Sequence, residues 1–590
     1  MSTADWIVLV ITLLGIVAYG LYKSRTTRNL EGYFLSNRTM PWYLVLLSIM
    51  GTQASAVTFL SGPGQAYTDG MRFVQYYFGL PIAMVVICIA FVPLFHKLKL
   101  ITAYELLEKK FDLKTRAFTS LLFLLQRGLS TGISVAAPSI ILSAILGWDI
   151  FWTNIFMGGL LIIYTVTGGA KAVAYTQQIQ LIIIIASMFL AGFMVVRLLP
   201  ANVGFMDALR MSGEAGKLNV ITDGQTAKGF DWTDRYNLIS GLIGGFFLAL
   251  SYFGTDQSQV GRYLTARSLT ESRLGLLMNG LVKVPMQFFI LLIGALVFVF
   301  YQFHPSPVFF DQTQVEKVNR SPYALEGKNI QQAYDSVNSL KKELTATWNP
   351  ETEHKEWKYL QKQSDSLRDE YKEVLTKSGA GGDPKDTNYI FLRFVIDYLP
   401  RGMVGLIIAM IFLASWGSIA AALNSLASTT MIDFHQRFSK TELSHEKQYK
   451  WSQGYTLVWG VLCILGAQFF TAIGNSLIEA VNILGSLFYG VILGVFLVSF
   501  YPRKISGTAV FWSAVIVEGY ILISAIWPWL HEKLPNAMDA IPSGLNTFMY
   551  TFSKIGFLWL IPIGAFGVVL LAFIFNLFSS KGKPSKNVMV

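Results

Sequence analysis

Apolar stretches of about 20 residues recur along most of the chain, and each is long enough to cross the hydrocarbon core of a bilayer as a helix. Backbone that faces lipid must satisfy its own hydrogen bonds, which favours helices. The pattern predicts about thirteen spans, at residues 5–23, 41–62, 73–95, 118–145, 148–167, 176–198, 237–261, 276–302, 396–432, 452–473, 477–500, 506–530 and 555–578. The sequence therefore predicts an all-α polytopic membrane protein.

The stretch from about residue 301 to 392 departs from this pattern, because it is polar and charged. Its segments 330–348 and 351–377 are rich in Lys, Glu, Leu and Gln, with Asn349-Pro350 between them and a flexible exit at Gly379 to Gly382. We expect a solvated helical hairpin here. The simplest interpretation is an insertion without a role in transport, and a binding module is the alternative.

Composition supports a membrane location for the rest of the chain. Of the 590 residues, 53% are hydrophobic and 14% are charged. A soluble domain of this size cannot bury so much apolar surface, whereas a bilayer can. The two cysteines, Cys88 and Cys463, lie inside apolar stretches. We expect them to be small buried hydrophobic side chains rather than disulfide partners or metal ligands.

The net charge of +11 is concentrated in every second loop. The basic loops contain Lys23 to Arg38 (with Arg25 and Arg28), His96 to Arg116, Lys171, Arg262 to Arg273, Arg437 to Lys450 (with Lys440), Arg503-Lys504 and Lys581 to Lys586. Basic loops stay in the cytoplasm, so we expect the N-terminus outside and the C-terminus in the cytoplasm of a multi-pass inner or plasma membrane protein. The hairpin then lies on the outer face.

The second span has polar and small residues where lipid-facing helices have apolar ones. Thr52, Gln53 and Ser55 interrupt it, and Gly62-Pro63-Gly64 follows. This pattern favours a helix that unwinds near Gly51 to Ala54, where freed carbonyl groups can coordinate a cation. A Gly/Ser-rich helix-packing interface is the alternative.

The ninth span carries hydroxyl groups at helical spacing. Ser415 and Ser418 are three residues apart and share a face. Hydroxyls from this helix and carbonyls from a broken one can surround a small cation without a buried full charge. Hydrogen bonding between helices explains the same serines without an ion.

Two charged features stand out in the seventh and eighth spans. Asp256 and Gln257 precede Arg262 near the cytoplasmic side. We interpret them as a polar cluster, with an ion pair that latches the inner gate. Lys283 lies inside an apolar helix. Such a lysine faces a cavity or a partner, or else extends its ammonium group to the interface.

Several motifs occur in a fixed order over most of the membrane part. They are Pro41-Trp42, Ser55-Ala56, Gly64 with Tyr67 and Gly70, Thr102-Ala103-Tyr104-Glu105, Gly168-Gly169-Ala170 with Thr176 and Gln180, Asp256-Gln257 with Arg262-Tyr263-Leu264, and Leu423-Asn424-Ser425 with Asp433. On these residues the chain resembles the sodium:solute symporter family, and the resemblance leaves out the hairpin.

The resemblance implies a five-plus-five inverted-repeat core with discontinuous helices. It divides the chain into residues 1–40 (an extra span and a cytoplasmic loop), 41–300 (the first repeat and the start of the second), 301–392 (the outer hairpin), 393–530 (the rest of the second repeat) and 531–590 (a last span and a cytoplasmic tail). It also implies sodium as the coupling ion, with no other metal or cofactor.

The resemblance implies a sodium site between the second and ninth spans. Its carbonyl donors would be Gly51, Ala54 and Ala414. The family usually has two adjacent hydroxyl residues on the ninth span, and here the pair is Gly417-Ser418. We expect Ser415 to compensate for the missing hydroxyl.

A second sodium ion is not expected. Some members bind one with an acidic residue early in the sixth span, where this chain has Gln177. A neutral amide is a poorer cation ligand than a carboxylate, so we expect one sodium ion per solute.

The solute pocket differs from that of sugar-carrying relatives, whose polar residues are replaced here by Thr58, Tyr77, Ala249 and Val481. Each unpaired sugar hydroxyl would cost about 1–3 kcal/mol. The expected solute is therefore a monocarboxylate, sugar acid, vitamin, amino acid or polyol. The candidate pocket residues are Gln53, Thr58, Phe59, Gln75, Tyr76, Tyr77, Ala249, Lys283 and Val481, and the candidate gate residues are Tyr252, Asp256 and Arg262.

We interpret the chain as a sodium-coupled symporter of a small organic solute that works by alternating access. A solute sensor of the same fold, a sugar symporter with a rearranged pocket and a sodium channel are the alternatives. An enzyme is not expected, because the sequence has no HExxH, no GxSxG and no glycine-rich phosphate loop. The expected partners are solute, sodium and lipid, and no nucleic acid.

Overall fold

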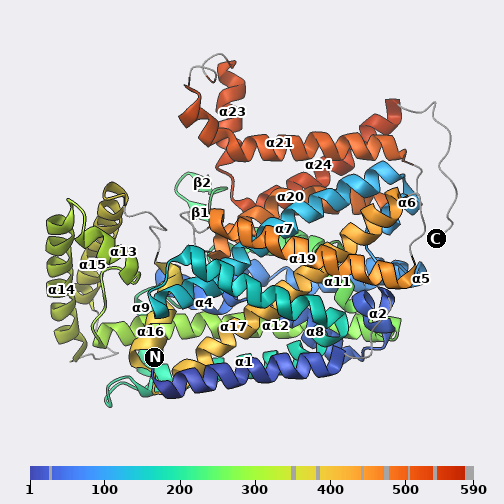
Figure 1. Cartoon of the computed structure of the whole chain (residues 1–590). Coiled ribbons are helices and arrows are strands. Elements are labelled where there is room, and N and C mark those ends of the chain that lie inside the picture. Colours follow the sequence, from blue (N-terminus) through green and yellow to red (C-terminus); the bar gives the residue numbers. More distant parts are fainter. Residues whose placement is uncertain are drawn as a thin grey trace.

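The computed structural model describes residues 1–24, 30–346, 354–379, 386–439, 444–470, 477–501, 505–535, 538 and 541–578. Most of these residues are helical. The strands within these ranges are β1 (Gln225–Thr226) and β2 (Gly229–Phe230), an antiparallel pair. Most long helices run along one axis, with α13, α14 and α15 at one end of the bundle and α2 and α6 at the other (Figure 1).

The chain enters the bundle through α1 (Thr3–Ser24), α2 (Leu30–Leu35), η1 (Ser36–Arg38), α3 (Trp42–Gln53), α4 (Ala56–Asp69), η2 (Met71–Tyr77), α5 (Leu80–Lys97), α6 (Glu105–Lys110), α7 (Leu113–Leu146), α8 (Ile150–Arg197) and α9 (Phe205–Glu214). It continues through η3 (Ser240–Gly244), α10 (Gly245–Gly254), α11 (Gln257–Tyr263) and α12 (Leu269–Phe303). It then leaves the bundle for α13 (Gln312–Asn319), α14 (Ala324–Ala346), α15 (Lys355–Lys377) and α16 (Thr387–Tyr398). It returns through α17 (Met403–Thr429), η4 (Thr430–His435), α18 (Gln436–Phe438), α19 (His445–Phe470), α20 (Leu477–Phe500), α21 (Gly507–Lys533), α23 (Ser543–Ser553) and α24 (Phe557–Phe578).

All thirteen predicted spans contain helix. Within the described ranges, nine helices are long and apolar enough to cross a membrane, and the bent pair α3 and α4 makes a tenth span. The other three predicted spans, 148–167, 237–261 and the described part of 452–473, are helical but shorter, interrupted or more polar. The chain is thus an all-helical membrane protein, as predicted.

The helix α8 contains two of the predicted spans, and its halves run in opposite directions. Asn154 bonds Gln468 near the C-terminal end of α19, whereas the carbonyl of Val166 accepts from Gln453 near its beginning. The second half runs in the opposite direction. Gln177, near its start, contacts Gly51 at the middle of the bundle, and Gly192, near its end, lies beside Ile293 in the C-terminal half of α12. The prediction of two spans therefore holds within one helical segment.

Polar side chains determine where several helices begin. Asp112 accepts the backbone N–H of Thr115 in α7, and Ser268 accepts that of Glu271 in α12. Asp256 caps α11 in the same way, by accepting the N–H of Ser258. These bonds satisfy amide groups that have no partner in the first turn of a helix. The cap at Asp256 also interrupts the predicted seventh span, a break that the sequence analysis did not anticipate.

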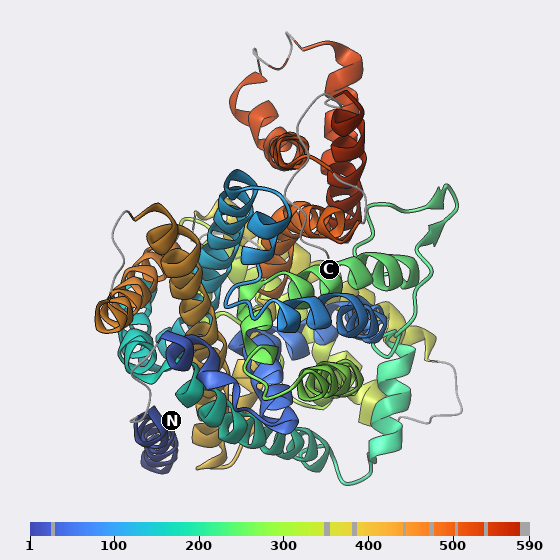
Figure 2. The ribbon, with the colours of Figure 1, turned by 90° about the vertical axis from the view of Figure 1, so that its right-hand side faces the viewer.

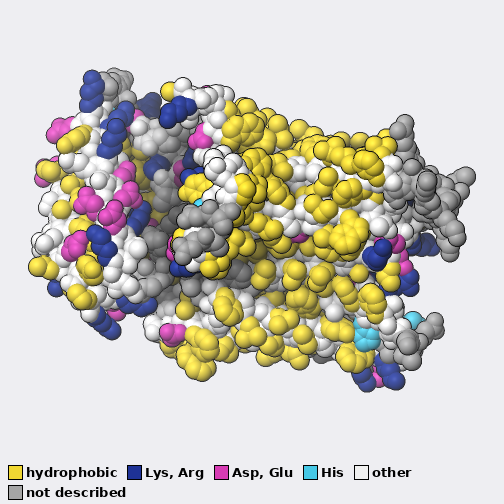
Figure 3. Space-filling model, turned by 90° about the horizontal axis from the view of Figure 1, so that it is seen from above, with side chains coloured by type: hydrophobic (Ala, Val, Ile, Leu, Met, Phe, Trp, Pro, Cys, Tyr) yellow, Lys and Arg dark blue, Asp and Glu magenta, His cyan; other side chains and the backbone are white. Residues whose placement is uncertain are grey.

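The surface has an apolar middle part and charged ends, as expected for a protein that spans a membrane. Large apolar side chains point outward along the middle of the bundle, including Ile89, which is 70% exposed, and Phe189, which is 60% exposed. Figure 3 shows hydrophobic side chains across this middle part and charged side chains toward the two ends. Viewed along the bundle, α21, α23 and α24 project from one side (Figure 2).

The predicted hairpin is formed by α14 and α15, which pack antiparallel outside the bundle. Ion pairing of Lys377 with Glu326 and a hydrogen bond from Lys341 to Gln361 connect the two helices. With α13 they enclose a small core of their own. Helix α14 begins at Ala324, earlier than predicted. Asn349-Pro350 and residues 380–382 of the predicted connections lie outside the described residues, as do the basic residues Arg25, Arg28, Lys440, Arg503, Lys504, Lys581, Lys583 and Lys586.

Candidate functional site

The second predicted span is broken in the middle. Helix α3 ends at Gln53, α4 begins at Ala56, and the two are bent by 62°. In a continuous helix the N–H of Ser55 would bond the carbonyl of Gly51, but it bonds the carbonyl of Gln53 instead, at 3.2 Å. The Gly51 carbonyl thereby loses its helical donor and becomes available to another ligand.

The broken span faces α17, as the sequence analysis expected. A methyl group added at Gly417 would lie 3.5 Å from the Gly51 carbonyl oxygen and 2.7 Å from Oε1 of Gln180. One added at Gly51 would lie 3.0 Å from the side chain of Gln177. Glycine at these two positions therefore lets α3, α8 and α17 approach closely.

Gln177 connects the three helices by hydrogen bonds. Its Oε1 accepts from the hydroxyl of Ser48 at 2.7 Å. Its Nε2 donates to the hydroxyl of Thr52 at 3.2 Å and to the carbonyl of Gly417 at 3.0 Å. All four residues are buried. The amide is thus fully used in joining α3 to α17.

The hydroxyl groups of α17 point in different directions. Ser418 donates to the carbonyl of Ser415 at 3.0 Å, and it lies one residue from the contact with Gly51. Ser415 donates to the carbonyl of Ser134 on α7, at 3.4 Å. Ala54 and Ala414 are both buried beside the break. Of the two serines, only Ser418 is free of a bond to another helix.

A cavity of about 140 Å³ lies next to the break. Seven of the nine candidate pocket residues line it: Gln53, Thr58, Tyr76, Tyr77, Ala249, Lys283 and Val481. The candidate gate residue Tyr252 lines it as well. The broken span therefore contributes to the cavity wall, so the candidate ion and solute sites are neighbours.

Lys283 is the unusual member of this lining. Its side chain is 1% exposed, and its ammonium group lies 5.4 Å from the ring centre of Tyr77. No acidic side chain of the described residues lies within ion-pairing distance of it. One helical turn earlier on α12, Asn279 accepts a hydrogen bond from the amide of Gln53. The cavity thus presents a cation without a counter-charge.

Phe59 and Gln75 do not line the cavity. Phe59 is buried in the apolar core that surrounds α4. The amide of Gln75 is used to hold the loop after α9, because it donates to Thr222 at 3.0 Å and to the carbonyl of Tyr236 at 3.1 Å. The sequence places both residues near the pocket but does not show which way their side chains point.

Polar residues from α7 and α20 also line the cavity, and they were not among the predicted pocket residues. Gln126, Arg127 and Ser130 line the cavity from α7, and Asn482 and Tyr489 line it from α20. Arg127 carried the same signal as Lys283, since it is a charged residue within a predicted span. Intramembrane charges generally face a cavity or a partner.

The expected ion pair between Asp256 and Arg262 is not present, and this prediction was wrong. Asp256 pairs instead with Arg127 and accepts from the hydroxyl of Tyr489 at 2.9 Å. Because Asp256 caps α11, its carboxylate is also bonded to Ser258. Arg262 lies almost two turns further along α11 and faces Asn424 at 3.5 Å. The guanidinium of Arg127 stands over the ring of Tyr252, so the cluster closes one end of the cavity.

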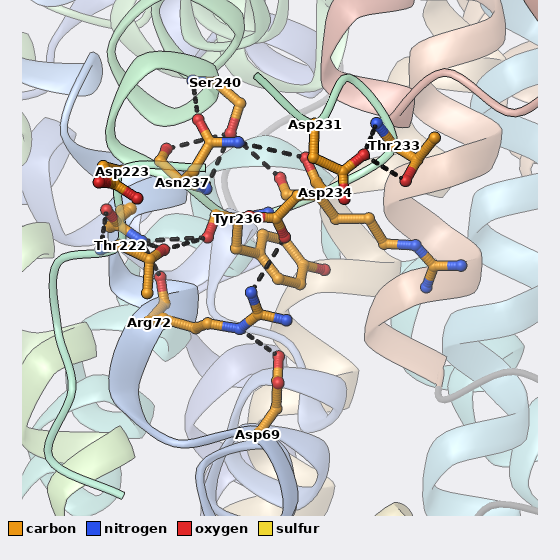
Figure 4. Close-up of polar contacts among 12 residues, drawn as sticks. Asp69, Arg72, Thr222, Asp223, Asp231, Thr233, Asp234, Tyr236, Asn237 and Ser240 are labelled. Carbon is orange, nitrogen blue, oxygen red and sulfur yellow. Dashed lines mark hydrogen bonds and ion pairs between the residues drawn. The ribbon is translucent and has the colours of Figure 1, made fainter. Parts of the chain in front are cut away.

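Polar contacts also close the opposite end of the cavity. The hydroxyl of Tyr76 donates to Asn482 at 3.0 Å, and Arg235 pairs with Glu479 at 3.0 Å. Beside them, Arg72 pairs with Asp69 and Asp234, both at 3.0 Å (Figure 4). The cavity therefore lies between two polar closures, one on each side of it.

A bundle of membrane-length helices with a broken helix beside an enclosed cavity defines a secondary transporter. The family model of the sodium:solute symporter family matches residues 33–319 and 373–517, and the chain belongs to this family. It is a multi-pass membrane protein and a sodium-coupled solute symporter, not an enzyme.

Relatives align along most of the chain. A sodium/sialic acid symporter of Aliivibrio fischeri is 26% identical over 568 residues, which cover 95% of this chain and 92% of that protein. The human sodium-coupled monocarboxylate transporter 1 is 24% identical, with 91% and 76% covered. A solved structure of a Na⁺-coupled sialic acid symporter, substrate-bound and outward-open, covers 100% of both chains with a TM-score of 0.73 and 23% identity. That structure shows the shared fold.

Proposed function

We propose that the protein carries one sodium ion and one small organic acid together across the inner or plasma membrane by alternating access. The break between α3 and α4 beside α17 supports the ion site. The ligands would be the carbonyl groups of Gly51, Ala54 and Ala414 and the hydroxyl of Ser418. A monovalent cation held by neutral oxygens needs no buried carboxylate. Ser415 is left out, because its hydroxyl faces α7.

The proposal of an acid rests on Lys283. A buried ammonium group without a counter-charge is costly inside a membrane protein. A carboxylate on the solute would supply the missing charge. The aromatic walls formed by Tyr76 and Tyr77 suit the apolar part of such a solute. The relatives named for sialic acid and for monocarboxylates agree with this choice.

The proposed orientation follows from the basic loops. The N-terminus and the hairpin would lie outside, and the two closures of the cavity would act as the outer and inner gates. Arg235 and Glu479 belong to the outer closure, and Asp256 with Tyr252 belongs to the inner one. Opening one gate at a time would expose both sites first to the outside and then to the cytoplasm.

The test is uptake of labelled pyruvate, sialic acid, biotin, proline and inositol into proteoliposomes, with and without an inward sodium gradient. We expect sodium-driven accumulation of acids and none of inositol. Ser418→Ala should raise the sodium concentration for half-maximal uptake about tenfold, the effect of losing one ligand.

Ser425→Ala is the matched control. Ser425 is a buried serine of the same helix whose hydroxyl bonds the carbonyl of Ala421 at 2.8 Å, away from the break. Its sodium dependence should be that of the unchanged protein. Normal sodium dependence in Ser418→Ala would disprove the ion site. Binding without accumulation would instead favour a solute sensor.

A further inference from the structure

The hairpin does not simply stand beside the bundle, because it encloses a second cavity. This cavity has a volume of about 200 Å³ and lies between α14, α15 and the ends of α4 and α12. Residues 320–372, which include most of the hairpin, are outside the part matched by the family model. The two hairpin helices stand side by side at the left of Figure 1, and Figure 3 shows charged side chains of both signs at this end.

Four cationic side chains line this second cavity, and the carboxylates of Asp365 and Asp369 line it as well. One of the four, Lys372 on α15, pairs with Asp369. Lys341 comes from α14, Arg368 from α15, and Lys217 from the loop after α9. Lys341 is 4% exposed and Arg368 is 7% exposed. The positive charge is therefore built into the contact between the hairpin and the bundle rather than spread over a solvated surface.

Lys341 and Lys217 bond neutral oxygens, although the carboxylate of Asp365 lies in the same cavity. Lys341 donates to the neutral oxygens of Gln361 at 2.6 Å and Asn338 at 3.4 Å. Lys217 donates to the carbonyl of Thr68 at 2.7 Å. Neither forms an ion pair with any acidic residue of the described part of the chain.

Arg368 is paired on one side only. Its Nη2 bonds both oxygens of Asp386 at 2.8 Å, whereas its Nη1 is buried without a hydrogen-bond partner. The amide nitrogen of Asn338, which also lines the cavity, is a second buried donor without a partner. Buried donors normally find an acceptor, so these two indicate one that is missing.

We propose that this cavity binds a small carboxylate anion, held by Arg368, Lys341 and the amide of Asn338. A guanidinium and an ammonium group together suit a planar carboxylate. The aromatic floor is formed by Tyr67 and Phe298, so an apolar substituent can be accommodated as well. The choice of a carboxylate rests on the proposed function, whereas the anion site itself does not.

The site lies at the end of α4, the second half of the broken span. Tyr67 and Thr68 belong to that end, and Thr68 also lines the adjoining cavity that leads past Arg72 and Glu479 toward the outer closure. A solute anion held here would be concentrated at the entrance to the transport pathway. Electrostatic attraction at such an entrance raises the rate of encounter.

The affinity of the site should depend on pH. Burial lowers the pKa of Lys341 to about 8, the nearby carboxylate of Asp365 opposes this shift, and Arg368 and Lys217 add to it. The protonated amine binds the anion. Affinity should therefore be complete below pH 8 and should fall as the pH rises through that value.

The test is calorimetric titration of the full-length protein in sodium-free buffer with the choline salts of pyruvate, phosphate and chloride. We expect pyruvate to bind, and Lys341→Met to weaken binding at least about tenfold, the effect of losing a charge-assisted hydrogen bond. Lys342→Met is the matched control, since Lys342 is the exposed neighbour on α14. Lys341→Arg should keep the affinity and lose its dependence on pH near 8.

Several results would overturn the proposal. Absence of pyruvate binding without sodium would do so, as would equal affinity in Lys341→Met and the unchanged protein. Binding of phosphate or chloride but not pyruvate would refute a carboxylate site. If Lys341→Met does not fold, Asn338→Ala provides the same comparison, because it removes the unpartnered amide donor of the site. The titration contains no sodium. Its result therefore does not depend on whether the protein carries out sodium-driven uptake.

Discussion

At the scale of single residues, Lys283 connects the cavity to the choice of solute. It is the buried cation of the cavity that no acidic side chain in the described ranges compensates, whereas Arg127 on the opposite wall pairs with Asp256. We therefore propose that binding of an acid compensates the charge of Lys283. The same residue should decide between acids and uncharged solutes.

Replacing Lys283 with methionine tests this role. The substitution keeps an unbranched side chain of similar length and removes the charge. We expect the KM for an acid to rise about tenfold or more, since a charge-assisted hydrogen bond is lost. Uptake of pyruvate at increasing concentration measures the change. The sodium dependence at saturating pyruvate should stay normal, and an unaltered KM would mean that Lys283 does not bind the solute.

Some residues of the candidate site could be predicted from the sequence, and others could not. Gln53 and Lys283 were identifiable because polar groups within an apolar span need a cavity or a partner. The partner of Asp256 was not identifiable, because Arg127 is far away in the sequence and the nearer Arg262 faces Asn424. The sequence places Ser415 and Ser418 on one face of a helix. It does not show that the hydroxyl of Ser415 donates to a carbonyl of α7.

At the scale of elements, the close approach of α3, α8 and α17 depends on glycine. A side chain at Gly417 would meet both Gln180 and the Gly51 carbonyl, so α17 would have to move away from the break. Packed helices cannot absorb such a change without strain. The ion site and the packing of these helices are therefore coupled.

Gly417→Ala should both destabilise the protein and weaken sodium binding. We expect a loss of about 1–3 kcal/mol, the usual cost of overpacking. Thermal unfolding of the purified protein and the sodium concentration for half-maximal uptake measure the two effects. Gly454→Ala on α19 is the control, since nothing lies within 4 Å of an added methyl group there. If both variants behave alike, the close approach at Gly417 has no influence on the ion.

The elements themselves were largely predictable. Runs of apolar residues predicted thirteen spans, of which ten are long and apolar enough to cross a membrane within the described ranges. Gly51 to Ser55 predicted the break, because both signals are local. The interruption at Thr255-Asp256 was missed, since a capping aspartate in an otherwise apolar stretch resembles an interfacial charge. The docking of the hairpin on α4 and α12 was also missed, because it depends on contacts between distant residues, such as Arg368 on α15 and the ring of Tyr67 on α4.

At the scale of the whole molecule, one sodium ion moving with a monovalent acid carries no net charge. We propose a single ion because the position of Gln177 holds an amide, bonded to Ser48, Thr52 and Gly417, instead of a carboxylate. Transport should then follow the sodium concentration gradient alone. A tenfold sodium gradient, worth about 1.4 kcal/mol, would support about a tenfold solute gradient.

Imposing a membrane potential on proteoliposomes tests this stoichiometry. A potassium gradient with valinomycin sets the potential while the sodium gradient is held constant. We expect the initial rate of pyruvate uptake to be unchanged between zero and an inside-negative potential of about 100 mV, where each net charge would be worth about 2.3 kcal/mol. Strong acceleration would show that two sodium ions accompany each acid.

We propose that a sodium ion binds where the α3–α4 break faces α17. Equilibrium binding of radioactive sodium to the purified full-length protein, without solute, measures this most directly. We predict one saturable site per chain, with affinity lowered about tenfold in Ser418→Ala and unchanged in Ser425→Ala. Equal sodium binding in both variants and the unchanged protein would place the ion elsewhere and contradict the account.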